Sequence, residues 1–230
     1  MTISLRSDAA RNRAVLVAAA REVMAERGLE APLDEIARRA GIGNATLYRR
    51  FPRRIDLIAA VFGDRMADHA RAVQTALDAR DPWEGLSGYL EAVADLQVHD
   101  RGIADLITMD VSTAPEIETL RDHAFRGLVT VIERAKAAGA LRADATPQDI
   151  LVILQANAGL VTRARPAERQ ASRRLIHLLL DGLRAEGATA GPPAPSAQRM
   201  RLAMRDHSRR AGLLGQPTAA TSPKSRKEHA

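Results

Sequence analysis

The side chains best suited to binding chemistry lie between Asn44 and Arg54. Asn44 offers a carboxamide, Thr46 a hydroxyl and a methyl group, and Tyr48 a phenol. Basic side chains follow directly, at Arg49, Arg50, Arg53 and Arg54. Short polar side chains can approach base edges, and guanidinium groups bind phosphates. The segment therefore predicts a surface that contacts duplex DNA.

Two short helices, expected over residues 33–40 and 44–50, would position these side chains. The Gly41-Ile42-Gly43 sequence between them is typical of a tight turn that buries one apolar side chain. The side chains expected to face inward are Ile36, Ala37, Ala40, Ile42 and Leu47. Ala37 lies where the helices would cross, so a large side chain there would push them apart. This small core would hold the second helix out from the domain, and a protruding helix fits the major groove.

The outward face of the second helix would make the contacts. Its first residues are short and would approach base edges, whereas those farther along would reach phosphates or guanine. Arg53 and Arg54 begin the next helix, whose free N–H groups also favour a phosphate. The expected DNA contacts are Leu33, Asn44, Ala45, Thr46, Tyr48, Arg49, Arg50, Arg53 and Arg54. The alternative is a helical hairpin in an all-α core, which would expose these arginines without an anion to bind.

The rest of the chain is also expected to be helical. Apolar residues make up 46% and aromatic residues only 3%, so alanine and leucine fill the core and favour helix over sheet. Start signals stand at Asp81-Pro82, Thr113-Ala114-Pro115 and Thr146-Pro147. The expected helices span 8–27, 33–40, 44–50, a long stretch from 53, one from 82, and then 115–138, 147–161 and 167–185. The fold class predicted is all-α, with nine or ten helices and no credible strand.

Charge and composition divide the chain into three parts. Residues 1–64 carry a net charge of +3, residues 65–186 carry −3, and residues 187–230 carry +6. We expect a helix-turn-helix domain over 9–64 and a helical domain over 65–186. The segment 187–230 is rich in proline and glycine, then basic, and is expected to be disordered apart from a possible short helix near 198–210. Arginine usage in a GC-rich genome explains the charge bias equally well, so net charge alone does not establish DNA binding.

Several classes of function find no support in the sequence. The chain has no cysteine, no apolar run long enough to span a bilayer, and no N-terminal pattern typical of a signal peptide. It also lacks a glycine-rich phosphate loop, a nucleophile elbow, and histidines or acids at metal-ligand spacing. We therefore expect a soluble cytoplasmic protein that is not an enzyme and needs no metal or cofactor.

The segment over residues 11–65 resembles the TetR family of bacterial regulators. The matching residues are Ile36-Ala37, Ala40-Gly41, Thr46-Leu47-Tyr48, Phe51, Arg54 and Leu57, after a helix that ends at Gly28. Two positions depart from the family pattern. Arg50 stands where relatives often have histidine, and Ile55 stands where they often have an acid. Because Arg50 still reaches phosphate, the departure implies changed affinity and not lost binding.

The resemblance implies a homodimer, held together by a four-helix bundle from residues 147–161 and 167–185 of each chain. It also implies a small-molecule effector between the helices of the middle region, whose binding shifts the spacing of two DNA-reading helices. Polar, aromatic and sulfur-containing side chains that could line such a cavity are His69, Trp83, Tyr89, His99, Met109, His123, Phe125 and Asn157. The alternative for each is an ordinary core or surface position.

The function expected is a repressor that binds a palindromic double-stranded DNA operator as a dimer and is released by an effector of unknown identity. The alternative is an architectural DNA-binding protein without an effector, controlled by protein partners. A cavity in the middle region would favour the first, and a filled core the second. The basic tail is an inert extension, a nonspecific DNA clamp or a protein-binding segment.

Overall fold

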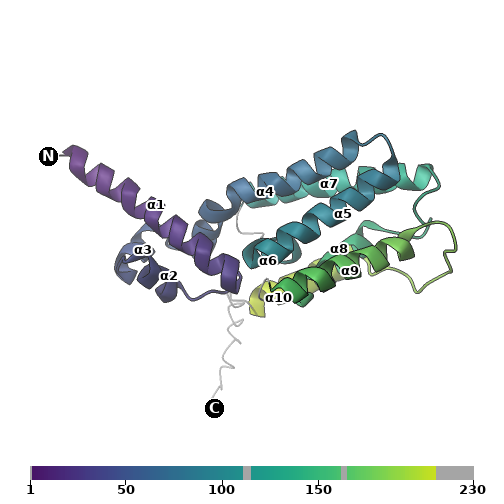
Figure 1. Ribbon diagram of the computed structural model, residues 1–230. Helices are drawn as coiled ribbons and strands as arrows, with labels where there is room; N and C mark the ends of the chain where they lie inside the picture. The colour runs from purple at the N-terminus through teal and green to yellow at the C-terminus, as the bar shows by residue number, and fades with distance from the viewer. Residues whose placement is uncertain (1, 111–114, 162–164, 211–230) are drawn as a thin grey trace, which may run out of the picture.

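The computed structural model describes residues 2–110, 115–161 and 165–210, and over these residues the chain forms ten helices and no strand. The all-α prediction is therefore confirmed. The helices are α1 (Thr2–Arg27), α2 (Leu33–Ala40), α3 (Asn44–Arg50), α4 (Arg54–Asp78), α5 (Pro82–His99), α6 (Arg101–Thr108), α7 (Pro115–Ala137), α8 (Pro147–Leu160), α9 (Pro166–Leu183) and α10 (Ala197–Arg210). Figure 1 shows α1 to α3 at one end of an elongated molecule and the remaining helices at the other.

The predicted start and stop signals lie at the ends of the helices. The Asp81 side chain accepts hydrogen bonds from the backbone N–H groups of Trp83 and Glu84, at 2.7 and 3.0 Å. At the start of α8, the Asp149 carboxylate accepts from the backbone N–H of Thr146 at 2.7 Å. These bonds satisfy donors that a helix N-terminus leaves unpaired. The predicted capping residue Thr113 lies outside the described residues, although α7 begins at Pro115 as expected.

Two helices, α1 and α6, differ from the predictions. Helix α1 begins at Thr2 and not near Asp8, because residues 2–8 contain no proline or glycine to stop it. Helix α6 was not predicted as a separate element. The chain breaks at Asp100, whose backbone is extended and whose side chain caps the new helix by accepting from the N–H of Ile103 at 3.1 Å.

In the described part of the segment 187–230, residues 197–210 form α10. This helix matches the short helix suggested near 198–210, and it is anchored by the buried side chains of Met200, Met204 and Ser208. An apolar pair one turn apart gives the helix a face to bury, which a purely basic segment would lack. Residues 211–230 lie outside the described residues.

Helix α4 connects the two ends of the molecule. Its first half, with Ile58 and Phe62 fully buried, completes the core beneath α1 and α2. Its second half packs along α5 and α7. A continuous helix of 25 residues therefore makes a stiff connection between the helix-turn-helix and the larger helical body.

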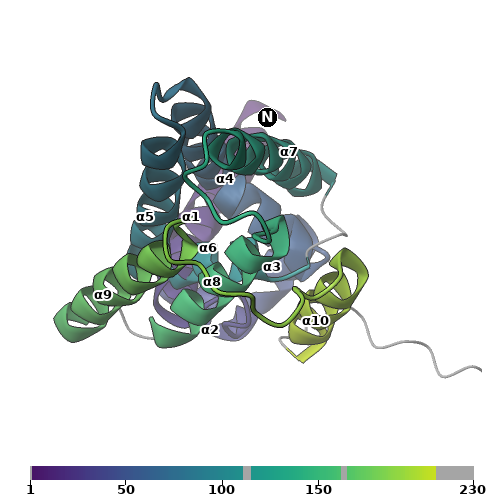
Figure 2. The same cartoon turned by 90° about the vertical axis from the view of Figure 1, so that its right-hand side faces the viewer.

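The helical body is arranged around α5, which packs against α4, α7, α8 and α9. A buried polar chain crosses it: Ser172 donates to Asn157 at 2.6 Å, Asn157 to Gln97 at 2.8 Å, and Gln97 to the Leu154 carbonyl at 3.1 Å. Figure 2 shows α10 at the edge of this body, across α8 from α9. Within the described ranges, no helix combines the length and the apolar character that crossing a membrane requires.

Candidate DNA interface and effector cavity

The short turn between α2 and α3 is built as the sequence predicts. Ile36, Ala37 and Leu47 are buried, at 0%, 1% and 1% exposure. Gly41 has a φ of 65°, a left-handed conformation that glycine adopts without steric cost. Its neighbour Ile42 donates its backbone N–H to the Ala37 carbonyl at 3.0 Å and packs against the core. The core of the helix-turn-helix thus fixes the angle at which α3 leaves the domain.

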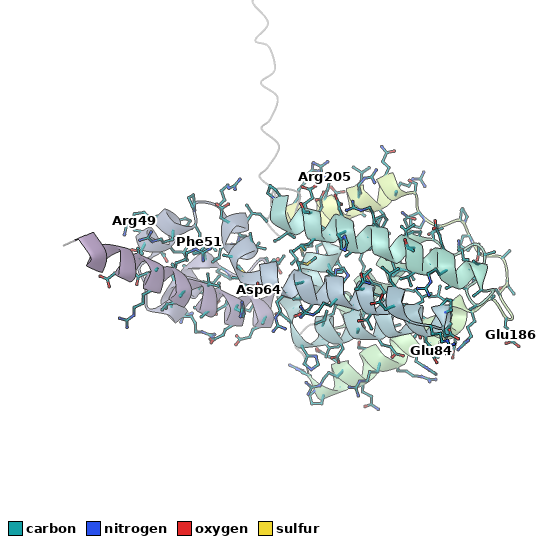
Figure 3. The ribbon with its side chains drawn as sticks, turned by 90° about the horizontal axis from the view of Figure 1, so that it is seen from above. Arg49, Phe51, Asp64, Glu84, Glu186 and Arg205 are labelled. Carbon is teal, nitrogen blue, oxygen red and sulfur yellow. The ribbon has the colours of Figure 1, made fainter. Side chains whose placement is uncertain are left out.

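The outer face of α3 presents the predicted contact residues to solvent. Asn44 and Ala45 are exposed at its N-terminal end, and Tyr48 is 53% exposed. The Arg49 guanidinium donates to the Thr46 hydroxyl at 2.7 Å, which holds both side chains on one face. Figure 3 shows Arg49 and Phe51 at the end of the molecule opposite Glu84. Leu33, by contrast, is half-buried against the core at the start of α2.

The two arginines that follow α3 have different surroundings. Arg53 is exposed and pairs with Asp56, which also accepts the Arg53 backbone N–H at 3.1 Å. Arg54 donates to the carbonyl oxygens of Leu29 and Ala31, at 2.9 and 2.6 Å. Burial lowers the pKa of Arg54, although its guanidinium stays charged. Arg54 therefore fastens the segment between α1 and α2 to the start of α4.

Two other basic side chains near the motif are paired within the protein. Arg39 on α2 lies 3.4 and 3.5 Å from Glu22 and Glu26 of α1, and Arg27 pairs with Glu35. Exposed pairs of this kind contribute little stability, about 0–1 kcal/mol each. They do neutralise positive charge on the α1–α2 side. Arg49 and Arg50 of α3 are exposed and have no carboxylate partner among the described residues, as is also true of Arg38 on α2 and of Arg11 and Arg13 on α1.

A cavity of about 700 Å³ lies in the helical body, between α4, α5, α7, α8 and α10. Volumes of this size are typical of small-molecule sites. The lining includes apolar residues from α7, α8 and α10 and from α6, and α10 supplies seven of the twenty lining residues. The apolar lining residues are Ile107, Ala124, Phe125, Leu128, Leu151, Leu154, Ala197, Met200, Leu202 and Met204.

Three of the side chains predicted to line an effector site do lie at this cavity: His69, Tyr89 and Phe125. His69 Nε2 and the Tyr89 hydroxyl are 3.1 Å apart, and both side chains are buried. Burial and the nearby Arg121 lower the pKa of His69 to about 4, so the ring is neutral at physiological pH. Burial also raises the pKa of Tyr89, which keeps its phenol protonated.

The other predicted residues lie elsewhere. Trp83 stacks under the Arg184 guanidinium, 4.3 Å from its ring centroid, and Met109 is buried in the core. His123 is exposed on α7, and Asn157 is committed to the buried polar chain. His99 is exposed and contacts the Asp95 carbonyl through Nδ1 at 2.7 Å. The structure does not bring these residues to the cavity.

Sequence reasoning missed two parts of the lining. Arg121 lies one helical turn before Phe125 on α7, and this spacing was the signal that both share a face. The contribution of α10 to the cavity was also missed, although Met200 and Met204 are likewise one turn apart. Its Arg205 lies 3.5 Å from Asp110, and Figure 3 shows Arg205 beside α7.

Helix α6 lies between the cavity and the helix-turn-helix. Its Ile107 lines the cavity, and its Asp105 accepts the backbone N–H of Leu29 at 2.9 Å. Gly28 has a φ of 81°, and a Cβ at this position would overlap the Asp105 carboxylate. Burial raises the pKa of Asp105, since only a few groups compensate its charge. Movement of α6 would therefore be transmitted directly to the segment before α2.

An exposed, basic α3 on a helix-turn-helix, joined to a larger helical body, defines a DNA-binding transcriptional regulator. Residues 16–61 match the family described as bacterial regulatory proteins, tetR family. Residues 81–185 match the C-terminal domain of SbtR-like transcriptional regulators. The chain belongs to the TetR family of transcriptional regulators, and its relatives are regulators and not enzymes.

Individual relatives agree with this family. A TetR transcriptional regulator from Streptomyces coelicolor is 35% identical, with 77% of this chain and 99% of that chain covered and a TM-score of 0.49. The transcriptional activator FasR of Mycolicibacterium smegmatis is 33% identical over 108 residues, which is 46% of this chain and 49% of FasR. The match thus spans about half the length of FasR. The regulator FadR of Bacillus subtilis, solved in complex with stearoyl-CoA, shares the fold at 18% identity and a TM-score of 0.52, covering 74% of this chain and 98% of its own.

Proposed function

We propose that the protein is a repressor that binds a palindromic operator as a homodimer and is released when an effector fills the cavity. The observation that carries the proposal is the physical route from cavity to DNA interface. Helix α6 lines the cavity with Ile107 and holds the segment before α2 through Asp105. A ligand changes DNA affinity only through unequal affinity for two states, and α6 is the element whose position both sites share.

The roles proposed for the α3 side chains follow from their placement. Asn44, Ala45 and Thr46 would approach base edges, and Tyr48, Arg49 and Arg50 would bind the phosphate backbone. Arg53 is exposed, so its guanidinium can leave Asp56 and bind a phosphate. Leu33 and Arg54 were expected among the contacts, and we now propose that they support the interface from below. Their burial and internal partners favour this role.

A homodimer is supported by two apolar stripes, of which the α8 residues and Leu178 and Gly182 of α9 are exposed, whereas Leu175 and Leu179 are half-buried. On α8 the stripe consists of Val152, Ala156, Gly159 and Leu160, and on α9 of Leu175, Leu178, Leu179 and Gly182. A Cβ at Gly159 or Gly182 would meet nothing within 4 Å, so a partner helix has room to approach closely. Exposed contiguous apolar surface on neighbouring helices is typical of a subunit interface.

Light scattering tests the dimer. The full chain is expected at twice its own mass, and Leu178→Glu is expected at the mass of one chain because it places a charge in an apolar interface. Val15→Glu is the matched control, since Val15 is an exposed apolar residue on α1, at 38% exposure. A monomeric wild-type chain would refute the dimer.

Selection of bound duplexes from a random DNA pool tests the operator. The full chain is expected to select two inverted half-sites, one or more duplex turns of about 34–36 Å apart. Asn44→Ala or Thr46→Ala should change the bases that are selected. Tyr48→Phe should instead lower the affinity for all DNA sequences by a similar factor. A selected site with no symmetry would overturn the dimeric mode of binding.

Transcriptional activation is the second candidate function. The observation that favours it is the relative FasR, which is named an activator. The position of the selected operator separates the two. A site that overlaps a promoter supports repression, and a site upstream of it supports activation. Because operator DNA in bacteria lies in the cytoplasm, we place the protein there.

A further inference from the structure

The guanidinium group of Arg121 is a charged group at the cavity for which the described part of the chain supplies no partner. Arg121 lines the cavity from α7 and is mostly buried. Among the described residues it makes no hydrogen bond or ion pair, and burial lowers its pKa against the opposing influence of Asp110, Asp122 and Glu118. A guanidinium stays charged in proteins, so Arg121 is a mostly buried cation that has carboxylates in its surroundings and no direct ion pair among the described residues.

The nearby carboxylates do not form an ion pair with Arg121 among the described residues. Glu118 and Asp122 are exposed on α7 at the rim of the cavity, where water solvates them. Asp110 lies 3.5 Å from Arg205 of α10. Two further cations, Arg201 and Arg205, line the α10 side. Glu118 and Asp122 are exposed lining residues, so Arg121 is the more buried charge on the α7 side of the cavity.

The polar wall beside Arg121 also offers a donor. The phenol of Tyr89 has His69 Nε2 as its only hydrogen-bond partner among the described residues. Both groups are neutral, and each carries one hydrogen-bond donor, so the contact between them uses one of the two donors and leaves the other available to a ligand. His69 Nδ1 is buried and has no hydrogen-bond partner in the described part of the chain. The wall thus holds a cation and a spare donor, which is either the Tyr89 O–H or the His69 N–H, and both suit a negatively charged acceptor.

We propose that the effector is an amphipathic carboxylate whose head binds Arg121 beside His69 and whose aliphatic body lies against α8 and α10. The inference rests on the proposed effector function. A carboxylate is an acceptor with a charge opposite to that of Arg121, and it can bind a guanidinium through two parallel hydrogen bonds. The body would contact Leu151, Leu154 and Met204, which are apolar lining residues of α8 and α10.

Calorimetric titration of the full chain without DNA tests the class of ligand. The probes are decanoate, decanol and decylamine, which share one aliphatic chain and differ in the head. Decanoate is expected to bind at least about 10-fold more tightly than decanol, and decylamine most weakly, since one charge-assisted bond is worth about 1.4 kcal/mol or more. Equal or tighter binding of decanol or decylamine would overturn the carboxylate class while leaving an effector site in place.

Variants on α7 identify the group that recognises the head. Arg121→Met should reduce decanoate affinity to that of decanol, and Arg121→Lys should retain part of the preference. Arg126→Met is the matched control, because Arg126 is exposed on the same helix and does not line the cavity. Replacing a mostly buried, unpaired cation by an apolar chain should not prevent folding. A preference for decanoate that survives Arg121→Met would refute the assignment.

The DNA complex separates this inference from the proposed function. Decanoate that binds with the expected preference and lowers affinity for the selected duplex supports both. Decanoate that binds with the same preference and leaves DNA affinity unchanged supports the ligand class and overturns effector release. Failure of all three probes to bind overturns the carboxylate class and removes the support for an effector site.

Discussion

Replacing Asp105 with alanine should loosen the segment that leads from α1 into α2. The Asp105 carboxylate is the acceptor for the backbone N–H of Leu29, at 2.9 Å, and Leu29 is fully buried. A buried donor left without an acceptor costs about 1–3 kcal/mol. Asp105→Asn is the matched control, because its amide oxygen keeps an acceptor at the same place and removes only the charge. The asparagine variant should stay within about 1 kcal/mol of the wild type.

Amide hydrogen exchange measures this bond at the residue concerned. In Asp105→Ala the Leu29 amide should exchange roughly 5- to 150-fold faster, which is the factor that corresponds to the lost 1–3 kcal/mol. Amides in α5 should change only as much as global stability does, as measured by urea unfolding. If Leu29 exchange in Asp105→Ala equals that of Asp105→Asn, the carboxylate does not hold this segment, and the proposed route from cavity to DNA interface loses its central contact.

Three further predictions concern buried side chains. The folded-state pKa of His69, about 4, lies below its ordinary 6.5, so the unfolded chain binds the proton first and stability is lost as pH falls from about 6.5 to about 4. The free energy of unfolding, measured with urea, should therefore fall between pH 7 and pH 4, and His69→Gln should make this fall smaller by roughly 3 kcal/mol. The exposed His99→Gln should leave the fall unchanged. Arg54→Met should cost roughly 1.5–3 kcal/mol, since it leaves two carbonyl oxygens without their charged donor, whereas Arg53→Met, at an exposed pair, should cost less than about 1 kcal/mol. Ala37→Leu should overpack the crossing of α2 and α3 by roughly 1–3 kcal/mol and lower DNA affinity, and a variant with wild-type stability and affinity would contradict the assigned crossing point.

Local signals made the helix-turn-helix predictable. Gly41 marks the end of α2, and the apolar residues Ile36 and Leu47 stand at spacings that place both inside. Helix α6 could not be predicted in the same way, because no proline or glycine separates it from α5. Its start depends on the extended backbone and side-chain cap of Asp100, and an aspartate within a helical pattern is equally compatible with a helix that continues without a break.

The cavity was less predictable than the DNA interface because it depends on long-range packing. His69 and Tyr89 are 20 residues apart, and only the packing of α4 against α5 brings them within 3.1 Å. Arg54 shows the opposite limit. Its position in the sequence suggests a phosphate contact, yet the carbonyl oxygens that it binds lie 23 and 25 residues earlier. The partner of a side chain depends on the tertiary structure, so the local sequence pattern does not predict it.

Residues 184–196 connect α9 to α10, and the last nine of them, 188–196, carry no regular structure and include three prolines. None of the closely packed helix pairs of the described chain includes α10, so its two buried methionines and its ion pair with Asp110 are its main attachments. A proline-rich tether of nine residues reaches roughly 28 Å at 3.1 Å per residue. Such a tether keeps a detached helix at an effective concentration in the millimolar range. Reseating of α10 over the cavity is therefore a first-order event, with a rate that does not depend on how much of the protein the cell contains.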